Sequence, residues 1–79
     1  MSYKNRKNGL VITEFYVEPS IKRIMGVASM ADGRFICGKG ADGNIYPICW
    51  AYEANEENAN EKNEELIQKI IADDYEEIQ

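Results

Sequence analysis

Apolar and polar residues alternate with a period of two over the first two-thirds of the chain. In residues 10–18, Val11, Phe15 and Val17 fall on one face of an extended segment, as in a strand buried on one side. Similar patterns predict further strands over residues 21–30, 34–39 and 44–51. Pro47 lies in the last of these and cannot donate to a ladder, which places that strand at a sheet edge or at a bulge.

The tripeptide Ala-Asp-Gly occurs twice, as Ala31-Asp32-Gly33 and Ala41-Asp42-Gly43, and an apolar run follows each copy. Asp-Gly between apolar runs is a strong hairpin signal, because Gly accepts positive φ and the Asp side chain bonds to the local backbone. Two such turns in series predict that consecutive strands pair as an antiparallel meander.

The pattern changes to a helical period near the C-terminus. Residues 64–78 carry one apolar stripe, formed by Leu66, Ile67, Ile70, Ile71, Tyr75 and Ile78. Asn58, Asn60 and Asn63 are candidate N-caps in the acidic, Asn-rich stretch 53–63, which reads as a linker or as a weak first part of the helix. Acidic residues crowd the predicted C-terminal end, where the helix dipole favours cations, so a cationic partner would relieve that end.

These elements predict one α+β domain with three parts. Residues 1–9 form a flexible basic N-terminal arm, and residues 10–52 form a four-stranded antiparallel β-meander that is strongly bent, towards a small barrel. Residues 53–79 form an acidic linker and one C-terminal amphipathic α-helix, which packs on the sheet or is swapped onto a second copy.

Charge is unevenly distributed along the 79 residues, whose formal net charge is −5. Residues 1–52 carry seven Lys or Arg against four Asp or Glu, whereas residues 53–79 carry two lysines against ten acidic residues. Such asymmetry indicates an interaction with something charged.

Candidate chemistry is sparse. The chain has no His, and its two cysteines, Cys37 and Cys49, flank the second Asp-Gly turn as opposite or diagonal neighbours on adjacent strands, where buried thiols are the favoured interpretation. The Gly-rich residues 38–43 lead into a strand rather than a helix, which favours a hairpin over a phosphate loop. We therefore expect no cofactor, no metal and no catalytic residue.

No signal peptide and no stretch of roughly 20 apolar residues is recognisable, so we expect a cytoplasmic protein with reduced thiols.

The leading hypothesis is a small acidic, non-enzymatic inhibitor or adaptor that occupies a basic surface of a protein partner, such as a surface that normally holds nucleic acid. Small inhibitors encoded by phages or plasmids often have this size and charge. The predicted partner-binding residues are acidic groups in and around the helix: Glu56, Glu57, Glu61, Glu64, Asp73, Asp74, Glu76 and Glu77.

Two other functions stay open. Aromatic and basic residues on the sheet would suit a module that binds nucleic acid or a small ligand, through Lys22, Arg34, Lys39, Tyr46 and Trp50. The acidic tail would repel phosphates, which disfavours nucleic acid. The third function is that of a structural subunit that buries its helix stripe in a homo-oligomer, with a dimer as the first guess.

Overall fold

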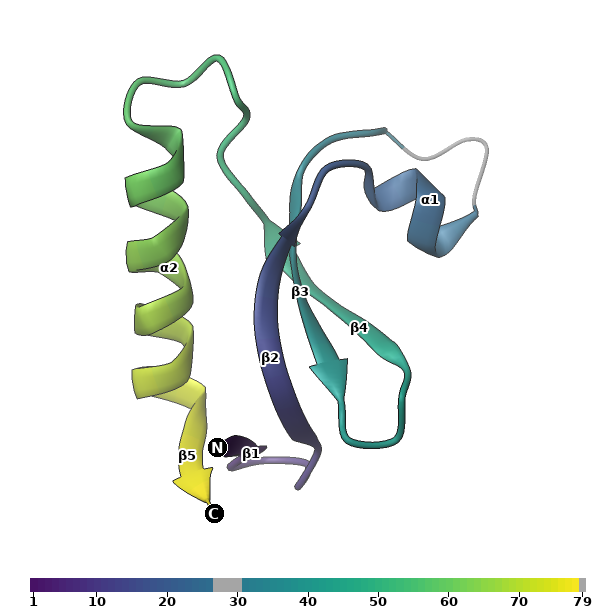
Figure 1. Ribbon diagram of the computed structural model, residues 1–79, viewed down its shortest axis with the longest axis vertical. Coiled ribbons are helices and arrows are strands. Elements are labelled where there is room, and N and C mark those ends of the chain that lie inside the picture. The colour runs from purple at the N-terminus through teal and green to yellow at the C-terminus, as the bar shows by residue number, and fades with distance from the viewer. Residues whose placement is uncertain (27–30, 79) are drawn as a thin grey trace.

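The computed structural model describes residues 1–26 and 31–78, and its described strands form one five-stranded antiparallel sheet (Figure 1). The strand order is β4-β3-β2-β1-β5. The elements in chain order are β1 (Ser2–Asn5), β2 (Val11–Glu18), α1 (Ile21–Met25), β3 (Phe35–Gly40), β4 (Ile45–Trp50), α2 (Ala59–Asp74) and β5 (Tyr75–Ile78). The predicted α+β class is confirmed, and β1, β2, β3 and β4 pair in chain order as an antiparallel meander; the sheet has five strands instead of four and is open instead of barrel-like.

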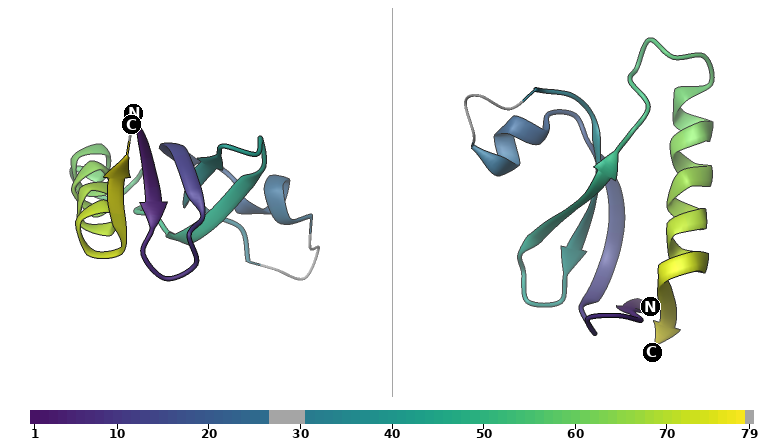
Figure 2. Two further views of the ribbon diagram at one scale, coloured as in Figure 1. Left: turned by 90° about the horizontal axis from the view of Figure 1, so that it is seen from below. Right: turned by 180° about the vertical axis from the view of Figure 1, so that it is seen from behind.

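The two helices lie on opposite sides of the sheet (Figures 1 and 2). Helix α2 packs its apolar stripe on one face of the sheet. The buried core between this helix and the sheet consists of Ile12, Ile36, Ile67, Ile70 and Tyr75. The short helix α1 lies on the other face of the sheet. Ile21 and Cys37 are buried on that face and are not part of the α2 core. Helix α2 is thus packed on the sheet of its own chain, as one of the two sequence alternatives has it.

The predicted strand over residues 21–30 is wrong in its described part, where Ile21–Met25 forms helix α1. The helix ends at Gly26, which takes a left-handed conformation with φ 66° and donates its N–H to the carbonyl of Lys22. Glycine is favoured at such a position because it has no Cβ. Residues 27–30 of the predicted strand lie outside the described residues.

The first nine residues differ from the predicted arm, because Ser2–Asn5 forms strand β1 between β2 and β5. A tight turn returns the chain from β1 to β2: Asn5 accepts two backbone N–H groups on its Oδ1, and Gly9 adopts φ 76°. The Asn-Gly pair at positions 8 and 9 is a turn signal of the same kind as Asp-Gly.

The C-terminal helix is displaced relative to its prediction: α2 begins at Ala59 and ends at Asp74, and Tyr75–Ile78 is strand β5. Two causes end the helix at Asp74. Glu76 and Glu77 would add negative charge to a helix C-terminus that already carries partial negative charge. In addition, the free edge of β1 offers backbone hydrogen bonds to an extended segment. Tyr75 also enters the core at the start of β5, where its ring meets that of Phe15 at a centroid distance of 5.1 Å.

The two Ala-Asp-Gly copies have different structures. The second closes the predicted hairpin between β3 and β4: Gly43 has φ 88° and donates to the carbonyl of Gly40, and Asp42 accepts the N–H of Asn44. The first makes no hairpin turn. Its Asp32 instead accepts hydrogen bonds at the start of α1, from the hydroxyl of Ser20 and the N–H of Lys22.

Candidate functional site

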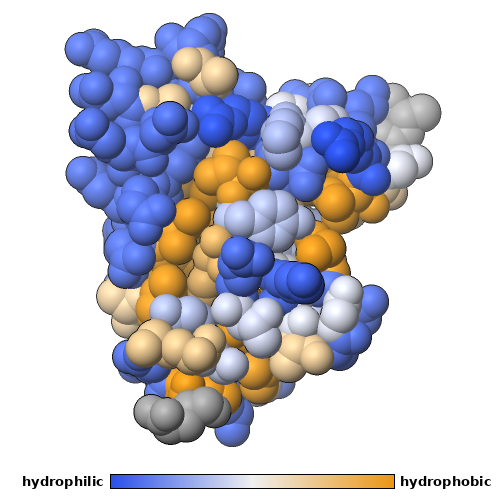
Figure 3. Space-filling model, viewed as in Figure 1, coloured by the Kyte–Doolittle hydropathy of each residue, from blue (hydrophilic) through white to orange (hydrophobic). Residues whose placement is uncertain are grey.

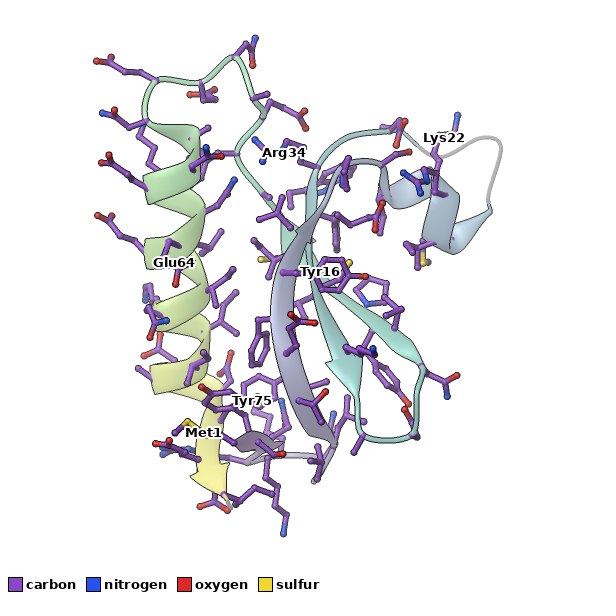
Figure 4. All side chains as sticks on the ribbon, in the orientation of Figure 1. Met1, Tyr16, Lys22, Arg34, Glu64 and Tyr75 are labelled. Carbon is purple, nitrogen blue, oxygen red and sulfur yellow. The ribbon has the colours of Figure 1, made fainter. Side chains whose placement is uncertain are left out.

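The eight acidic residues predicted to bind a partner are all exposed, but they do not form one surface. Glu56, Glu57, Glu61 and Glu64 form a loop-side acidic group before and along the first turns of α2, and Glu64 is labelled in Figure 4. Asp73, Asp74, Glu76 and Glu77 form a strand-side acidic group at the other end of α2 and on β5. A 16-residue helix is about 24 Å long, so the two groups are well separated.

The strand-side acidic group lies beside basic residues of its own chain. Arg6 donates its backbone N–H to the carbonyl of Asp74 at 2.9 Å and its Nε to the carbonyl of Tyr75 at 3.1 Å. Lys69 forms an ion pair with Asp73 at 3.0 Å. A cation thus already supports the end of α2 for which the sequence indicated a cationic partner.

The loop-side acidic group makes no ion pair within the described residues, although Arg34 lines the same hollow as Glu61. Among residues 1–26 and 31–78, the ion pairs are Lys69–Asp73 and Arg23–Glu18, and neither includes this group. Glu64 accepts a hydrogen bond from Gln68 at 3.3 Å. The surface of α2 and of the loop before it is hydrophilic, next to an apolar band along the sheet (Figure 3). This group is therefore the part of the predicted site that stays open to a cationic partner.

The alternative ligand-binding residues are not brought to one surface. Lys22 lies on α1, Arg34 precedes β3 and Lys39 lies on β3. A bulge in β4 separates the two aromatic residues, because Cys37 pairs with Pro47 while the preceding Ile36 pairs with Cys49. One extra residue reverses the alternation of faces.

Tyr46 consequently faces α2 and packs against the core, and its hydroxyl donates to Asp42. That hydrogen bond lowers the pKa of the Asp42 carboxyl and raises the pKa of Tyr46. Trp50 lies on the opposite face, 49% exposed, with its ring edge-on to Phe35. Regular alternation over residues 44–51 would predict that Tyr46 and Trp50 share a face of the strand, and that prediction is wrong because of the bulge. The edge position predicted for this strand is confirmed, and the bulge falls beside Pro47.

The two thiols are free, and the prediction that they are opposite or diagonal neighbours is wrong, because the bulge pairs Cys49 with Ile36 and Cys37 with Pro47 and so places them on opposite faces. Cys37 is 0% exposed, and its burial, together with the nearby Glu18 carboxylate, raises its pKa to about 11. Burial also raises the pKa of Cys49. Both therefore stay protonated and unreactive near neutral pH. Within the described ranges, no group of three His, Cys, Asp or Glu residues is arranged to hold a metal.

The sequence interpretation missed the role of Asn63, which is 1% exposed on the sheet side of α2. Its Oδ1 accepts the N–H of Tyr52 at 2.7 Å, and its Nδ2 donates to the carbonyl of Tyr52 at 3.1 Å. The amide thereby fixes the chain leaving β4 against α2. The signal in the sequence was its spacing of four residues from Ala59 and Ile67, which puts an asparagine in the apolar stripe.

Comparison of the chain with protein-family models, curated proteins and solved structures gave no match. No helix in the described part of the chain is long and apolar enough to cross a membrane. A function can therefore be inferred only from the surfaces of the molecule.

Proposed function

We propose that this protein is a non-enzymatic binding protein that occupies a basic surface of a protein partner through the loop-side acidic group. The observation that carries the proposal is the exposure of Glu56, Glu57, Glu61 and Glu64 at one end of α2, where none of the four takes part in an ion pair of the described residues. Negative charge gathered on one end of a small molecule steers it to a positive surface and orients it on arrival.

Two features support this choice. Glu61 lies in the first turn of α2, where the helix dipole stabilises acidic side chains, so part of the negative charge is placed at no cost to the helix. A basic surface that accepts a row of carboxylates is the kind that accepts phosphates, and we propose that the partner is a nucleic-acid-binding protein that this chain inhibits.

The alternative of a ligand-binding sheet has less support, because Tyr46 and Trp50 lie on opposite faces. The structure of the sheet offers bases no continuous stacking platform from these residues.

The test is affinity capture with the full chain from lysate of its own source, with bound protein and nucleic acid identified together. A variant with Glu56→Gln, Glu57→Gln, Glu61→Gln and Glu64→Gln removes four charges from the loop-side group. The matched control, Asp73→Asn, Asp74→Asn, Glu76→Gln and Glu77→Gln, removes four charges from the strand-side group. We expect one basic protein with the wild type and the control, and its loss with the loop-side variant.

Binding of the identified protein, once purified, should weaken as salt rises, and the loop-side variant should show a flatter salt dependence. Equal capture by the two variants would refute the assignment of the site. Nucleic acid retained by the wild type and by both variants would indicate that the sheet, and not the acidic groups, forms the binding site.

A further inference from the structure

Two exposed aromatic residues lie where the chain leaves β4 towards α2. Trp50 is 49% exposed and Tyr52 is 42% exposed. The Trp50 ring packs on Phe35 on the face away from α2, whereas the Tyr52 ring lies beside Lys62 of α2. A shallow hollow lined by Trp50, Ala51, Tyr52 and Leu66 adjoins a second one lined by Tyr52, Lys62, Glu65, Leu66 and Lys69. We call the surface formed by Tyr52 and Leu66, with Lys62 and Lys69 beside them, the aromatic flank. Trp and Tyr are the residues that most often anchor protein interfaces.

The charges beside the aromatic flank differ from those of the surrounding surface. Lys62 and Lys69 are the two lysines that residues 53–79 contain against ten acidic residues, and both line this flank. Lys62 lies 5.5 Å from the centre of the Tyr52 ring, and Lys69 pairs with Asp73. With Glu65 included, the flank is locally neutral in an otherwise acidic half of the molecule.

The flank is also held in place before anything binds to it. Asn63 bonds both backbone groups of Tyr52, so the segment that carries Tyr52 is fixed against α2. A surface whose aromatic groups are ordered in advance loses little entropy on binding.

We propose that a second copy of this chain covers the aromatic flank, with the two α2 helices antiparallel across a two-fold axis. The charged residues along the flank alternate in sign: Lys62, Glu65, Lys69 and Asp73. In an antiparallel pair whose two-fold axis lies at the level of Ile67 and Gln68, Lys62 lies opposite Asp73 of the second copy, and Lys69 lies opposite Glu65. A contact of this type is self-complementary, as a two-fold interface requires.

Charge selects this occupant. Two chains of net charge −5 repel each other, and the aromatic flank is where they meet with balanced charges. Sheet extension at the neighbouring β4 edge is a poor alternative, because Pro47 and the bulge interrupt the hydrogen bonding of that edge. The contact is therefore made by side chains, and the loop-side acidic group stays exposed on both copies.

Sedimentation velocity of the full chain over a range of micromolar concentrations tests the proposal. We expect a species of twice the 9.0 kDa chain mass, in exchange with the monomer. A single 9.0 kDa species at every concentration would overturn the proposal.

Charge reversal distinguishes this interface from others. The variant Lys62→Glu with Lys69→Glu should weaken dimerisation by about tenfold or more, since it places like charges across the axis. The variant Glu65→Lys with Asp73→Lys should weaken it as well, and mixing the two variants should restore a heterodimer. A mixture that stays monomeric would refute the antiparallel pairing.

The control Lys22→Glu with Lys39→Glu makes the same change in net charge at residues away from the flank, on α1 and β3. Circular dichroism verifies that each variant is folded. If the control dissociates the dimer as strongly as the flank variant, net repulsion and not this surface explains the loss. Each of these outcomes is independent of whether the acidic partner-binding proposal holds.

Discussion

The two faces of the sheet are covered in different ways. On the α2 face, five buried apolar or aromatic residues from four elements pack together, and a 16-residue helix covers them. On the α1 face, the helix has five residues, and polar groups attach it: Asp32 bonds to Ser20 and Lys22, and the N–H of Ile21 donates to the carbonyl of Gly33 at 3.0 Å. Burial of apolar area therefore stabilises the α2 face, whereas hydrogen bonds hold helix α1 on the other face.

The α1 face also holds buried groups that are more polar. Glu18 is 8% exposed and lies 3.9 Å from Arg23, and Cys37 lies on the same face as the paired Tyr16. Burial, together with the nearby Cys37 and Glu18, raises the pKa of Tyr16. A face built in this way responds to pH and tolerates partial detachment, whereas the α2 face unfolds with the whole domain.

The largest expected effect is that of truncating the α2 face. Ile36→Ala should lower the free energy of unfolding by about 4 kcal/mol, because it leaves a cavity in the centre of the core. Ile21→Ala should cost about 2 kcal/mol, because the short helix α1 can relax over the gap. Both side chains are 0% exposed, so the pair is matched for burial. Urea unfolding followed by Trp50 fluorescence measures the two costs, and equal costs would remove the contrast between the faces.

The next effect concerns the polar group inside the α2 face. Asn63→Ala should cost about 2 kcal/mol, since it leaves the N–H and the carbonyl of Tyr52 without partners at a buried position. Asn63→Asp places a carboxylate against the Tyr52 carbonyl at a buried position, so its cost should be at least as large at neutral pH. Asn60→Ala, on the exposed side of α2, is the control and should change stability by less than about 0.5 kcal/mol. A similar cost for Asn60→Ala would show that the hydrogen bonds of Asn63 are not the cause.

The smallest effect is expected in acid, on the α1 face. Hydrogen bonds from the Ser20 hydroxyl, followed by the Lys22 N–H, lower the pKa of Asp32 below its ordinary value of 3.8. A lowered pKa means that the ionised carboxylate stabilises the attachment of α1, so this contribution is present above pH 3.8 and is lost as the pH falls through the lower, folded-state value. The amide chemical shift of Lys22 should report a midpoint below 3.8, and Asp32→Asn should abolish that titration. A midpoint at or above 3.8 would show that these hydrogen bonds do not favour the ionised form.

Local patterns predicted those elements whose partners are near in sequence. Strands β2, β3 and β4, the hairpin at Asp42-Gly43 and the edge position of β4 follow from alternation, turn chemistry and one proline, because each depends on a few adjacent residues. The exposure of the acidic residues also follows from composition. Their division into two groups does not, because it depends on the length of α2 between them and on Arg6, which the fold brings to the end of that helix.

The two Ala-Asp-Gly copies show where local patterns fail to predict structure. Asp32-Gly33 and Asp42-Gly43 have identical local chemistry, yet the first supports the start of a helix and the second closes a hairpin. Ser20, twelve residues earlier, decides the difference by donating to Asp32. The bulge beside Pro47 is a similar case, since its extra residue places Tyr46 and Trp50 on opposite faces and a regular alternation cannot foresee it.

The sequence by itself determined the fold class, the three central strands, the apolar stripe of α2 and the uneven charge, because side-chain periodicity and turn propensities act over a few residues. The tertiary structure alone decided the two outer strands. Ser2–Asn5 becomes a strand by pairing with Tyr75–Ile78 at the other end of the chain, and neither segment has an alternation that would specify it. Backbone hydrogen bonding at a free sheet edge, together with burial of Tyr75, stabilises both segments, and these terms exist only once the core has brought the chain ends together.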